Sequence, residues 1–253
     1  MSRGTEETTL GDLPPPYGTV VFDCDSTLCA IEGIEELARE DAEIARLTRA
    51  AMEGTVPLEE VYGRRLALVQ PTRADVEHIG ARYVETLLPN AIPLVAALQA
   101  LGKRVCIVSG GLLPAVRRAA EALAIPPAQV FAVDLRFDAT GRYEGFDESS
   151  PLARAGGKIA LLRSLRRAEE RLSFVGDGAT DLEAASEADR FVAFGGVVRH
   201  ARVLAAARVR CLDPDFRALL PLLCSSAERA ELERRPEHRA LLQLPRAAAP
   251  PTA

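Results

Sequence analysis

The fold of this chain is decided by the stretch Thr19-Val20-Val21-Phe22-Asp23-Cys24-Asp25-Ser26-Thr27. Its four apolar or β-branched residues at the start predict a buried parallel strand. Side chains alternate along a strand, so Asp23 and Asp25 are expected to share a face while Cys24 points away. Open α/β sheets bind their ligands beyond the carboxyl ends of the strands. Two carboxylates at such a strand end are costly to keep charged without a metal or a proton, which favours phosphate chemistry with a hard cation.

The composition limits the class of protein. The chain has 253 residues, 48% of them hydrophobic, and a net charge of −5, which suits one sizeable core with a small addition. It has no basic block with interleaved aromatics, so nucleic acid is not an expected partner. It has no apolar run of membrane-spanning length and no signal-peptide pattern, so a membrane is not expected either. The five scattered cysteines form no CxxC pair, which predicts reduced thiols and a cytoplasmic protein.

The chain divides into segments of different pattern. Residues 1–17 have few apolar side chains and predict a loose, disordered leader. Residues 31–88 show helical periodicity and predict a helical cap inserted after the first strand. Residues 18–30 and 89–224 are expected to form an α/β core. Residues 225–253, rich in Arg, Glu, Ala and Pro, predict a polar tail.

Strands and helices alternate in the predicted core. Apolar runs predict strands at 104–108, 129–133, 172–175, 190–194 and 209–211, with a small hairpin within 134–146. Helical patterns occupy 91–101, 110–121, 158–167 and a segment from about 181. This alternation predicts a doubly wound, mostly parallel, Rossmann-like sheet.

The opening pair of aspartates suits covalent phosphoryl transfer. Asp23 can attack phosphorus and hold an aspartyl phosphate, which splits a difficult hydrolysis into two steps. Asp25 can protonate the leaving alkoxide and then deprotonate the attacking water. The plainer alternative is that one aspartate only caps a turn, but two at this spacing after a buried strand favour the site.

Two further motifs place anion-binding groups at helix starts. Ser109-Gly110-Gly111 predicts a strand-to-helix turn whose backbone N–H groups approach an anion closely, although an ordinary junction capped by Ser109 explains it alone. Lys158 follows two glycines at a predicted helix start, where a cation opposes the helix dipole unless an anion is near. Lys158 can then neutralise the nucleophile and the phosphoryl group, or be a plain surface lysine.

The fourth motif, Gly176 to Asp181, follows a predicted strand. Asp177 is placed to be an oxygen ligand for Mg²⁺, and Asp181 to orient Lys158 or a metal-bound water. A turn with an N-cap is the alternative. All four motifs fall at a strand end or a helix start, and this coincidence favours a single site.

With these motifs the chain resembles the haloacid dehalogenase superfamily of phosphohydrolases, and within it the phosphoserine phosphatase branch. The resemblance runs from about Thr19 to Leu223. Besides the four motifs, it rests on the segments Ala51–Pro57, Arg65–Pro71 and Glu144–Glu148.

The resemblance implies a role for each matching residue. Asp23 would be the nucleophile and a Mg²⁺ ligand, Asp25 the general acid/base and a ligand through its backbone carbonyl, and Asp177 the third protein ligand. Lys158 and Ser109 would hold the phosphoryl group. In the cap, Glu32 would pair with an ammonium and Arg65 would clamp a carboxylate. The other residues implied to line the substrate site are Met52, Glu53, Gly110, Gly111, Thr180, Asp181 and His200.

The implied activity is Mg²⁺-dependent hydrolysis of O-phospho-L-serine to L-serine and phosphate, the last step of serine biosynthesis. One alternative is a phosphatase or phosphotransferase that acts on another small phosphate monoester. Another is a non-catalytic phosphometabolite-binding protein, which the intact set of Asp23, Asp25, Lys158 and Asp177 disfavours. The expected partner is a small-molecule phosphate monoester, and the assembly considered is a homodimer.

Overall fold

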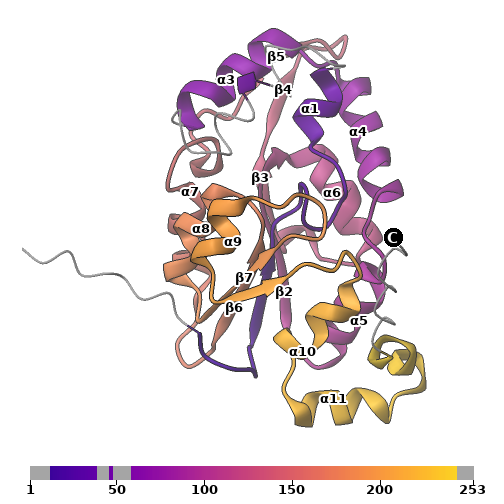
Figure 1. Cartoon of the computed structure of the whole chain (residues 1–253). Coiled ribbons are helices and arrows are strands. Elements are labelled where there is room, and N and C mark those ends of the chain that lie inside the picture. Colours follow the sequence, from indigo (N-terminus) through magenta and orange to yellow (C-terminus); the bar gives the residue numbers. More distant parts are fainter. Residues whose placement is uncertain (1–11, 39–45, 48–57, 244–253) are drawn as a thin grey trace, which may run out of the picture.

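The computed structural model describes residues 12–38, 46–47 and 58–243, and its centre is a six-stranded sheet (Figure 1). The strand order is β3-β2-β1-β6-β7-β8, and every neighbouring pair is parallel. The strands are β1 (Thr19–Phe22), β2 (Arg104–Leu112), β3 (Val130–Val133), β6 (Leu172–Gly176), β7 (Arg190–Phe194) and β8 (Val209–Cys211). The predicted doubly wound α/β fold is confirmed.

This strand order places the site. The chain enters the sheet at β1, runs outward through β2 and β3, and returns beside β1 as β6. Phe22 of β1 pairs in register with Val175 of β6, so the residues that follow the two strands lie next to each other. A doubly wound sheet binds ligands at such a reversal of strand order. All four residues of β1 are buried, as expected for a central parallel strand.

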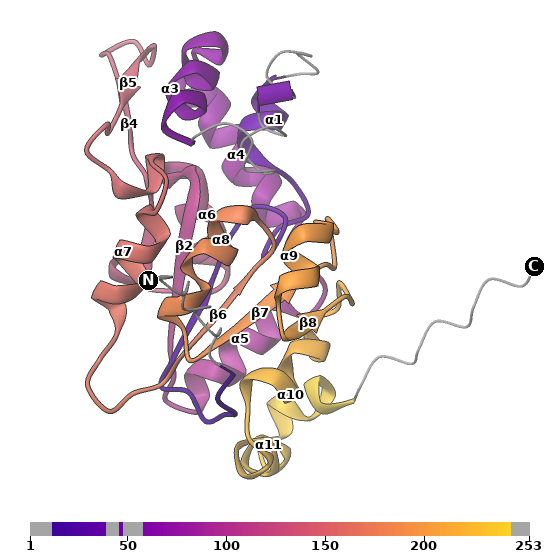
Figure 2. The same ribbon diagram turned by 60° about the vertical axis from the view of Figure 1, so that its left-hand side comes forward.

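Helices cover both faces of the sheet. Figures 1 and 2 place α5 and α6 on one face and α7, α8 and α9 on the other. Their bounds are α5 (Ala91–Ala100), α6 (Leu113–Ala122), α7 (Gly157–Leu165), α8 (Ala179–Ala184) and α9 (Ala201–Ala206). None of the helices in the described ranges is long and apolar enough to span a bilayer.

The segment predicted to be helical after β1 contains α1 (Gly33–Ala38), α3 (Leu58–Val69) and α4 (Arg73–Glu85). Helix α4 packs along α6 of the core; a Cβ on Gly80 would lie 2.7 Å from Arg118 Cγ. The antiparallel hairpin of β4 (Leu135–Phe137) and β5 (Tyr143–Phe146) reaches the same end of the molecule (Figure 1). Its Phe146 packs edge-on against Tyr62 of α3, with ring centroids 5.3 Å apart. Helices and hairpin together therefore cover the carboxyl ends of the strands.

Two terminal segments differ from the expected loose leader and polar tail. Tyr17 is buried and its hydroxyl donates to the Leu13 carbonyl at 2.6 Å, so the chain is packed before β1 begins. After α10 (Leu220–Leu223), the predicted tail begins with α11 (Ser226–Glu233), and Leu232 of this helix is fully buried. The Lys103 ammonium, itself buried, donates to the Tyr17 carbonyl at 2.8 Å and pairs with Glu228 of α11. The polar composition of the two segments did not reveal that Tyr17 and Leu232 are buried.

Strand β2 is also longer than predicted. Its pairing with β3 shifts in register between Val108 and Leu112, so the chain stays extended through Ser109-Gly110-Gly111. The expected turn at these glycines is therefore wrong, and α6 starts only at Leu113.

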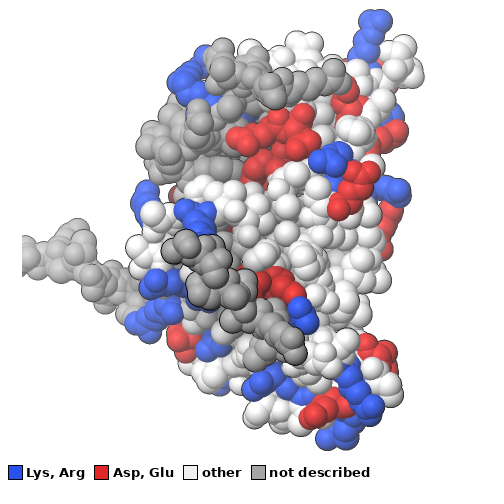
Figure 3. All heavy atoms as spheres, turned by 45° about the vertical axis from the view of Figure 1, so that its right-hand side comes forward, with Lys and Arg blue, Asp and Glu red and all other residues white. Residues whose placement is uncertain are grey.

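The surface carries both signs of charge. Figure 3 shows acidic side chains gathered in the upper part of one face, whereas basic and acidic side chains are intermixed at its lower end. On this face, positive charge is therefore not concentrated in one patch.

Candidate active site

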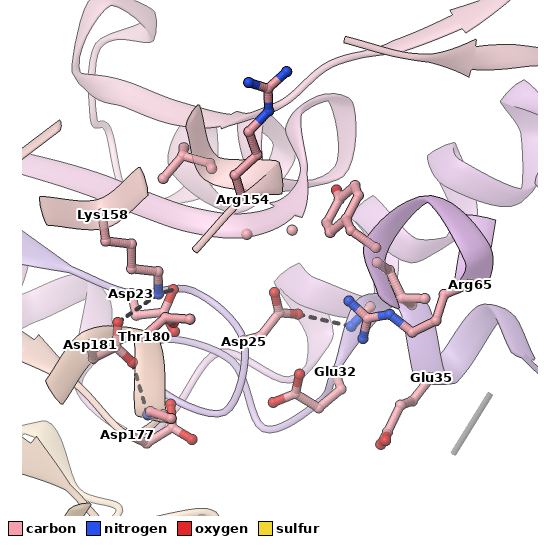
Figure 4. A pocket seen from close by; sticks show the side chains of 18 of the residues that line it. Asp23, Asp25, Glu32, Glu35, Arg65, Arg154, Lys158, Asp177, Thr180 and Asp181 are labelled. Atoms are coloured by element: carbon pink, nitrogen blue, oxygen red, sulfur yellow. Dashed lines mark hydrogen bonds and ion pairs between the residues drawn. The ribbon is translucent and has the colours of Figure 1, made fainter. Parts of the chain in front are cut away.

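A cavity of about 110 Å³ opens beyond the carboxyl ends of β1 and β6 (Figure 4). Its walls come from the loop after β1, the starts of α1, α7 and α8, helix α3 and the end of β2. The residues predicted for the site that line it are Asp23, Asp25, Glu32, Arg65, Gly110, Gly111, Lys158, Asp177, Thr180 and Asp181. Segments far apart in sequence thus meet in one cavity, as the sheet topology requires.

A buried lysine joins two aspartates at one end of the cavity. Lys158 Nζ lies 2.9 Å from Asp23 Oδ1 and 2.6 Å from Asp181 Oδ1. Burial opposes the charge of Lys158, but Asp181 and Asp23 outweigh it and raise the pKa of Lys158 above its ordinary value. Lys158 therefore stays protonated, ready to attract an anion that enters the cavity.

Two glycines before Lys158 determine where helix α7 begins. Helix α7 begins at Gly157, and a Cβ there would lie 1.7 Å from the Pro151 carbonyl oxygen. The residue before it, Gly156, has φ of 72°, which L side chains rarely adopt. The close approach to Pro151 fixes the start of α7, from which Lys158 reaches Asp23.

The Asp25 carboxylate is held by three donors. Oδ1 accepts from the Gly33 backbone N–H at 2.8 Å and from the Tyr83 hydroxyl at 2.5 Å. Oδ2 accepts from Ser109 Oγ at 3.3 Å, and Ser109 Oγ in turn accepts from the Gly111 N–H at 2.9 Å. Burial, followed by the charge of Asp25, raises the pKa of Tyr83 well above its ordinary value, so Tyr83 remains a donor.

The aspartates at the strand ends have the donor set for a divalent cation. Carboxylate oxygens of Asp23, Asp177 and Asp181 lie within 4.8 Å of one another. Burial and then Asp181 raise the pKa of Asp23 to about 7, and the same two causes raise the pKa of Asp177 well above its ordinary value. A cation held by these carboxylates would supply positive charge that favours their ionised forms.

The three aspartates are not equivalent as ligands. Asp181 Oδ1 is paired with Lys158, and its Oδ2 accepts from the Gly178 N–H at 2.8 Å. Asp177 Oδ1 accepts from Thr27 Oγ1 at 2.8 Å, and its Oδ2 lies 3.6 Å from His200 Nε2. Asp23 and Asp177 therefore fit a cation better than Asp181, which orients Lys158.

The opposite end of the cavity carries a different pair of charges. In Figure 4 Glu32 and Arg65 lie across the cavity from Lys158, with Asp25 between them. The Ser26 hydroxyl donates to Glu32 Oε1 at 2.5 Å, and the Arg65 guanidinium lies over the ring of Tyr62 at 5.8 Å. Burial raises the pKa of Glu32 and lowers that of Arg65, because each charge has lost much of its water.

Some predicted residues lie elsewhere. Ser109 touches Asp25 from behind the cavity wall and does not line it. His200 precedes α9 and does not line the cavity either, although its Nε2 is 3.6 Å from Asp177 Oδ2. Met52 and Glu53 fall outside the described residues.

Sequence reasoning missed several residues of the site. Tyr62 lines the cavity three residues before Arg65, and this spacing on one helix face is a signal that could have found it. Arg154 lines the cavity four residues before Lys158, but an arginine in a loop carries no signal of its own. Tyr83 is far from every motif in the sequence and only the packing of α4 reveals it.

Comparison with known proteins identifies the family of this chain. The family model for haloacid dehalogenase-like hydrolases matches residues 17–189. Phosphoserine phosphatases of Bos taurus and Homo sapiens are 43% and 42% identical over 185 residues, covering 71% of this chain and 82% of each relative. The solved structure of a phospho-aspartyl intermediate analogue of phosphoserine phosphatase is similar with a TM-score of 0.68 at 26% identity, covering 83% of this chain and 100% of that one. The chain therefore belongs to the haloacid dehalogenase-like hydrolases and, within them, to the phosphoserine phosphatase family.

Proposed function

We propose that this protein hydrolyses O-phospho-L-serine to L-serine and phosphate through an aspartyl phosphate on Asp23, with Mg²⁺ as cofactor. The observation that carries the proposal is the division of one cavity into two ends. Lys158 and the aspartates form an end suited to a phosphoryl group, and Glu32 with Arg65 forms an end suited to an amino acid. The bovine and human relatives, both phosphoserine phosphatases, support this assignment.

The reaction begins with Asp23 as nucleophile. Its carboxylate attacks phosphorus, the bond from phosphorus to the serine oxygen breaks, and that oxygen takes the proton of Asp25. Lys158, 2.9 Å from Asp23, stabilises the negative charge of the transferring group. Water then gives a proton to Asp25 and attacks the phosphorus, which releases phosphate and restores the Asp23 carboxylate.

The metal would be held by Asp23, Asp177 and the backbone carbonyl of Asp25. When bound, Mg²⁺ neutralises the nucleophile and the phosphoryl oxygens. The hydrogen bond from Thr27 orients Asp177 for this role. Asp181 keeps Lys158 turned toward Asp23.

Recognition of the amino acid falls to the cap end. Glu32 would accept the substrate ammonium, and Arg65 would bind its carboxylate with two parallel hydrogen bonds. Pairing with these substrate charges also compensates Glu32 and Arg65 for the water that each lost on burial. Of the other predicted contacts of the substrate, Gly110, Gly111 and Thr180 line the cavity, whereas Ser109 and His200 do not and Met52 and Glu53 lie outside the described residues.

Three properties outside the site stay predictions. All five cysteines are unpaired and buried, which favours a reducing compartment such as the cytoplasm. A homodimer, and the expectation of neither nucleic acid nor membrane as partner, rest on sequence alone.

The test is phosphate release by the purified full-length chain, with Mg²⁺ and with EDTA, from a panel of monoesters. We expect O-phospho-L-serine to have the highest kcat/KM, with activity abolished by EDTA and by Asp23→Asn. A higher kcat/KM for an unrelated monoester would refute the substrate, and metal-independent turnover would refute the cofactor. Adding an acceptor alcohol separates hydrolysis from transfer, because transfer yields a new phosphate ester in place of free phosphate.

A further inference from the structure

We propose that Tyr83 is a positioning residue for Asp25, and that its hydroxyl directs the proton of this acid to the oxygen facing the substrate. The inference rests on the proposed role of Asp25 as general acid. Tyr83 belongs to α4, 58 residues from Asp25 in sequence, and no motif assigns it a function.

The hydrogen bonds of Asp25 are unequal. Oδ1 accepts from the Tyr83 hydroxyl at 2.5 Å and from the Gly33 N–H at 2.8 Å. A carboxyl oxygen offers two acceptor sites, so these two donors occupy Oδ1 fully. In the acid form of Asp25 the proton must therefore lie on Oδ2.

Oδ2 lies where a leaving oxygen can reach it. In Figure 4 the oxygen of Asp25 that is not bonded to Gly33 points into the cavity. A Cβ on Gly111 would lie 2.7 Å from Oδ2, so the absence of a side chain there keeps the approach open. The remaining protein contact of Oδ2, from Ser109 at 3.3 Å, is long enough to be replaced by a substrate oxygen.

The donor itself is held rigidly. The Tyr83 side chain is fully buried, and α4 is packed along α6. A Cβ on Gly33 would lie 2.3 Å from the Tyr83 hydroxyl oxygen, so the start of α1 closes over the hydroxyl. The tyrosine cannot turn away, and the carboxyl of Asp25 keeps one orientation through the reaction.

The experiment measures how strongly the rate depends on the leaving group. The quantity kcat/KM reports the steps up to formation of the phosphoenzyme, in which Asp25 acts as acid. General acid catalysis contributes about 10²–10⁴-fold, and it matters most for poor leaving groups. For Tyr83→Phe we expect kcat/KM to fall roughly 10- to 100-fold with O-phospho-L-serine and less than about threefold with p-nitrophenyl phosphate.

A series of substituted phenyl phosphates makes the test independent of amino acid recognition. We expect the plot of log(kcat/KM) against leaving-group pKa to be steeper for Tyr83→Phe than for the wild type. In an Asp25→Asn background, Tyr83→Phe should not change the slope further, since the two residues act as one unit. Replacement of Tyr83 by 4-aminophenylalanine, which retains a donor, should restore the wild-type slope.

The matched control is Tyr17→Phe. It removes another buried hydroxyl, bonded to the Leu13 carbonyl at 2.6 Å and far from the cavity, and should leave the slope unchanged. An equal loss on every phosphate in Tyr83→Phe, or an unchanged slope, would overturn the inference and make Tyr83 a packing residue. Failure of the wild type to hydrolyse phosphoserine would instead refute the proposed function, and the phenyl phosphates would still decide the role of Tyr83.

Discussion

The ionised Asp23 carboxylate should destabilise the metal-free protein. We therefore expect Asp23→Asn to raise the free energy of unfolding. Burial and the neighbouring Asp181 raise the pKa of Asp23 from 3.8 to about 7 in the folded state, despite the opposing Lys158. Between these values the folded protein retains a proton that the unfolded chain has released. The free energy of unfolding therefore falls as pH rises from about 4 to 7, and stays low above pH 7.

The size of the effect follows from the shift. One pKa unit corresponds to about 1.4 kcal/mol, so the ionised Asp23 carboxylate costs on the order of a few kcal/mol at pH 8, whereas at pH 5 the folded state keeps the proton and the cost is smaller. Asparagine has a similar shape but cannot ionise, so the variant avoids this cost. In EDTA we expect Asp23→Asn to exceed the wild type in unfolding free energy at both pH values, and by more at pH 8 than at pH 5.

Urea unfolding followed by circular dichroism at pH 5 and pH 8 measures the difference. Glu77→Gln, on the exposed face of α4, is the control and should change stability by less than about 0.5 kcal/mol. Adding Mg²⁺ should stabilise the wild type more than the Asn variant, because the cation binds the ionised carboxylate. A variant no more stable than the wild type at pH 8 in EDTA would refute the reasoning.

Other perturbations test the remaining parts of the site. Arg65→Ala should raise KM for O-phospho-L-serine roughly 10- to 100-fold with little change for p-nitrophenyl phosphate, since a hydrogen bond to a charged group contributes about 1.5–3 kcal/mol. The control is Arg64→Ala, a change at the exposed neighbouring residue. Equal effects of the two variants would contradict a carboxylate clamp. Thr27→Val should weaken Mg²⁺ activation about 10-fold or more, measured by titrating activity with the metal, and an unchanged midpoint would show that this hydroxyl does not orient a ligand. Gly33→Ala should lower the free energy of unfolding by about 1–3 kcal/mol, because its Cβ would overlap the Tyr83 hydroxyl, and a wild-type urea midpoint would contradict that packing.

The core of the fold and the phosphoryl end of the site were predictable from sequence. Buried parallel strands are short apolar runs, and the motifs that contain Asp23, Lys158 and Asp177 each follow one of them or open a helix. Once strand order reverses between β1 and β6, Asp23 and Asp177 must meet. Local pattern therefore determined both the elements and the residues at their ends.

What could not be predicted depends on contacts between distant segments. Tyr83 has the pattern of any core residue on an amphipathic helix, and its contact with Asp25 arises only when α4 packs on α6. The extension of β2 to Leu112 comes from a register shift against β3, which no local pattern encodes. Leu232 was concealed by its charged neighbours in α11, because composition averages over a helix that is apolar on one face only.

The ion pair of the buried Lys103 with the half-buried Glu228 has a consequence for how the protein is made. Lys103 leaves the ribosome 125 residues before Glu228. A nascent chain that has completed the sheet therefore still lacks the carboxylate partner of the Lys103 ammonium. The ion pair of Lys103 forms only when α11 packs against this end of the sheet. We therefore expect a chain that ends just after β8 to retain the predicted site residues and to be less stable than the full-length protein.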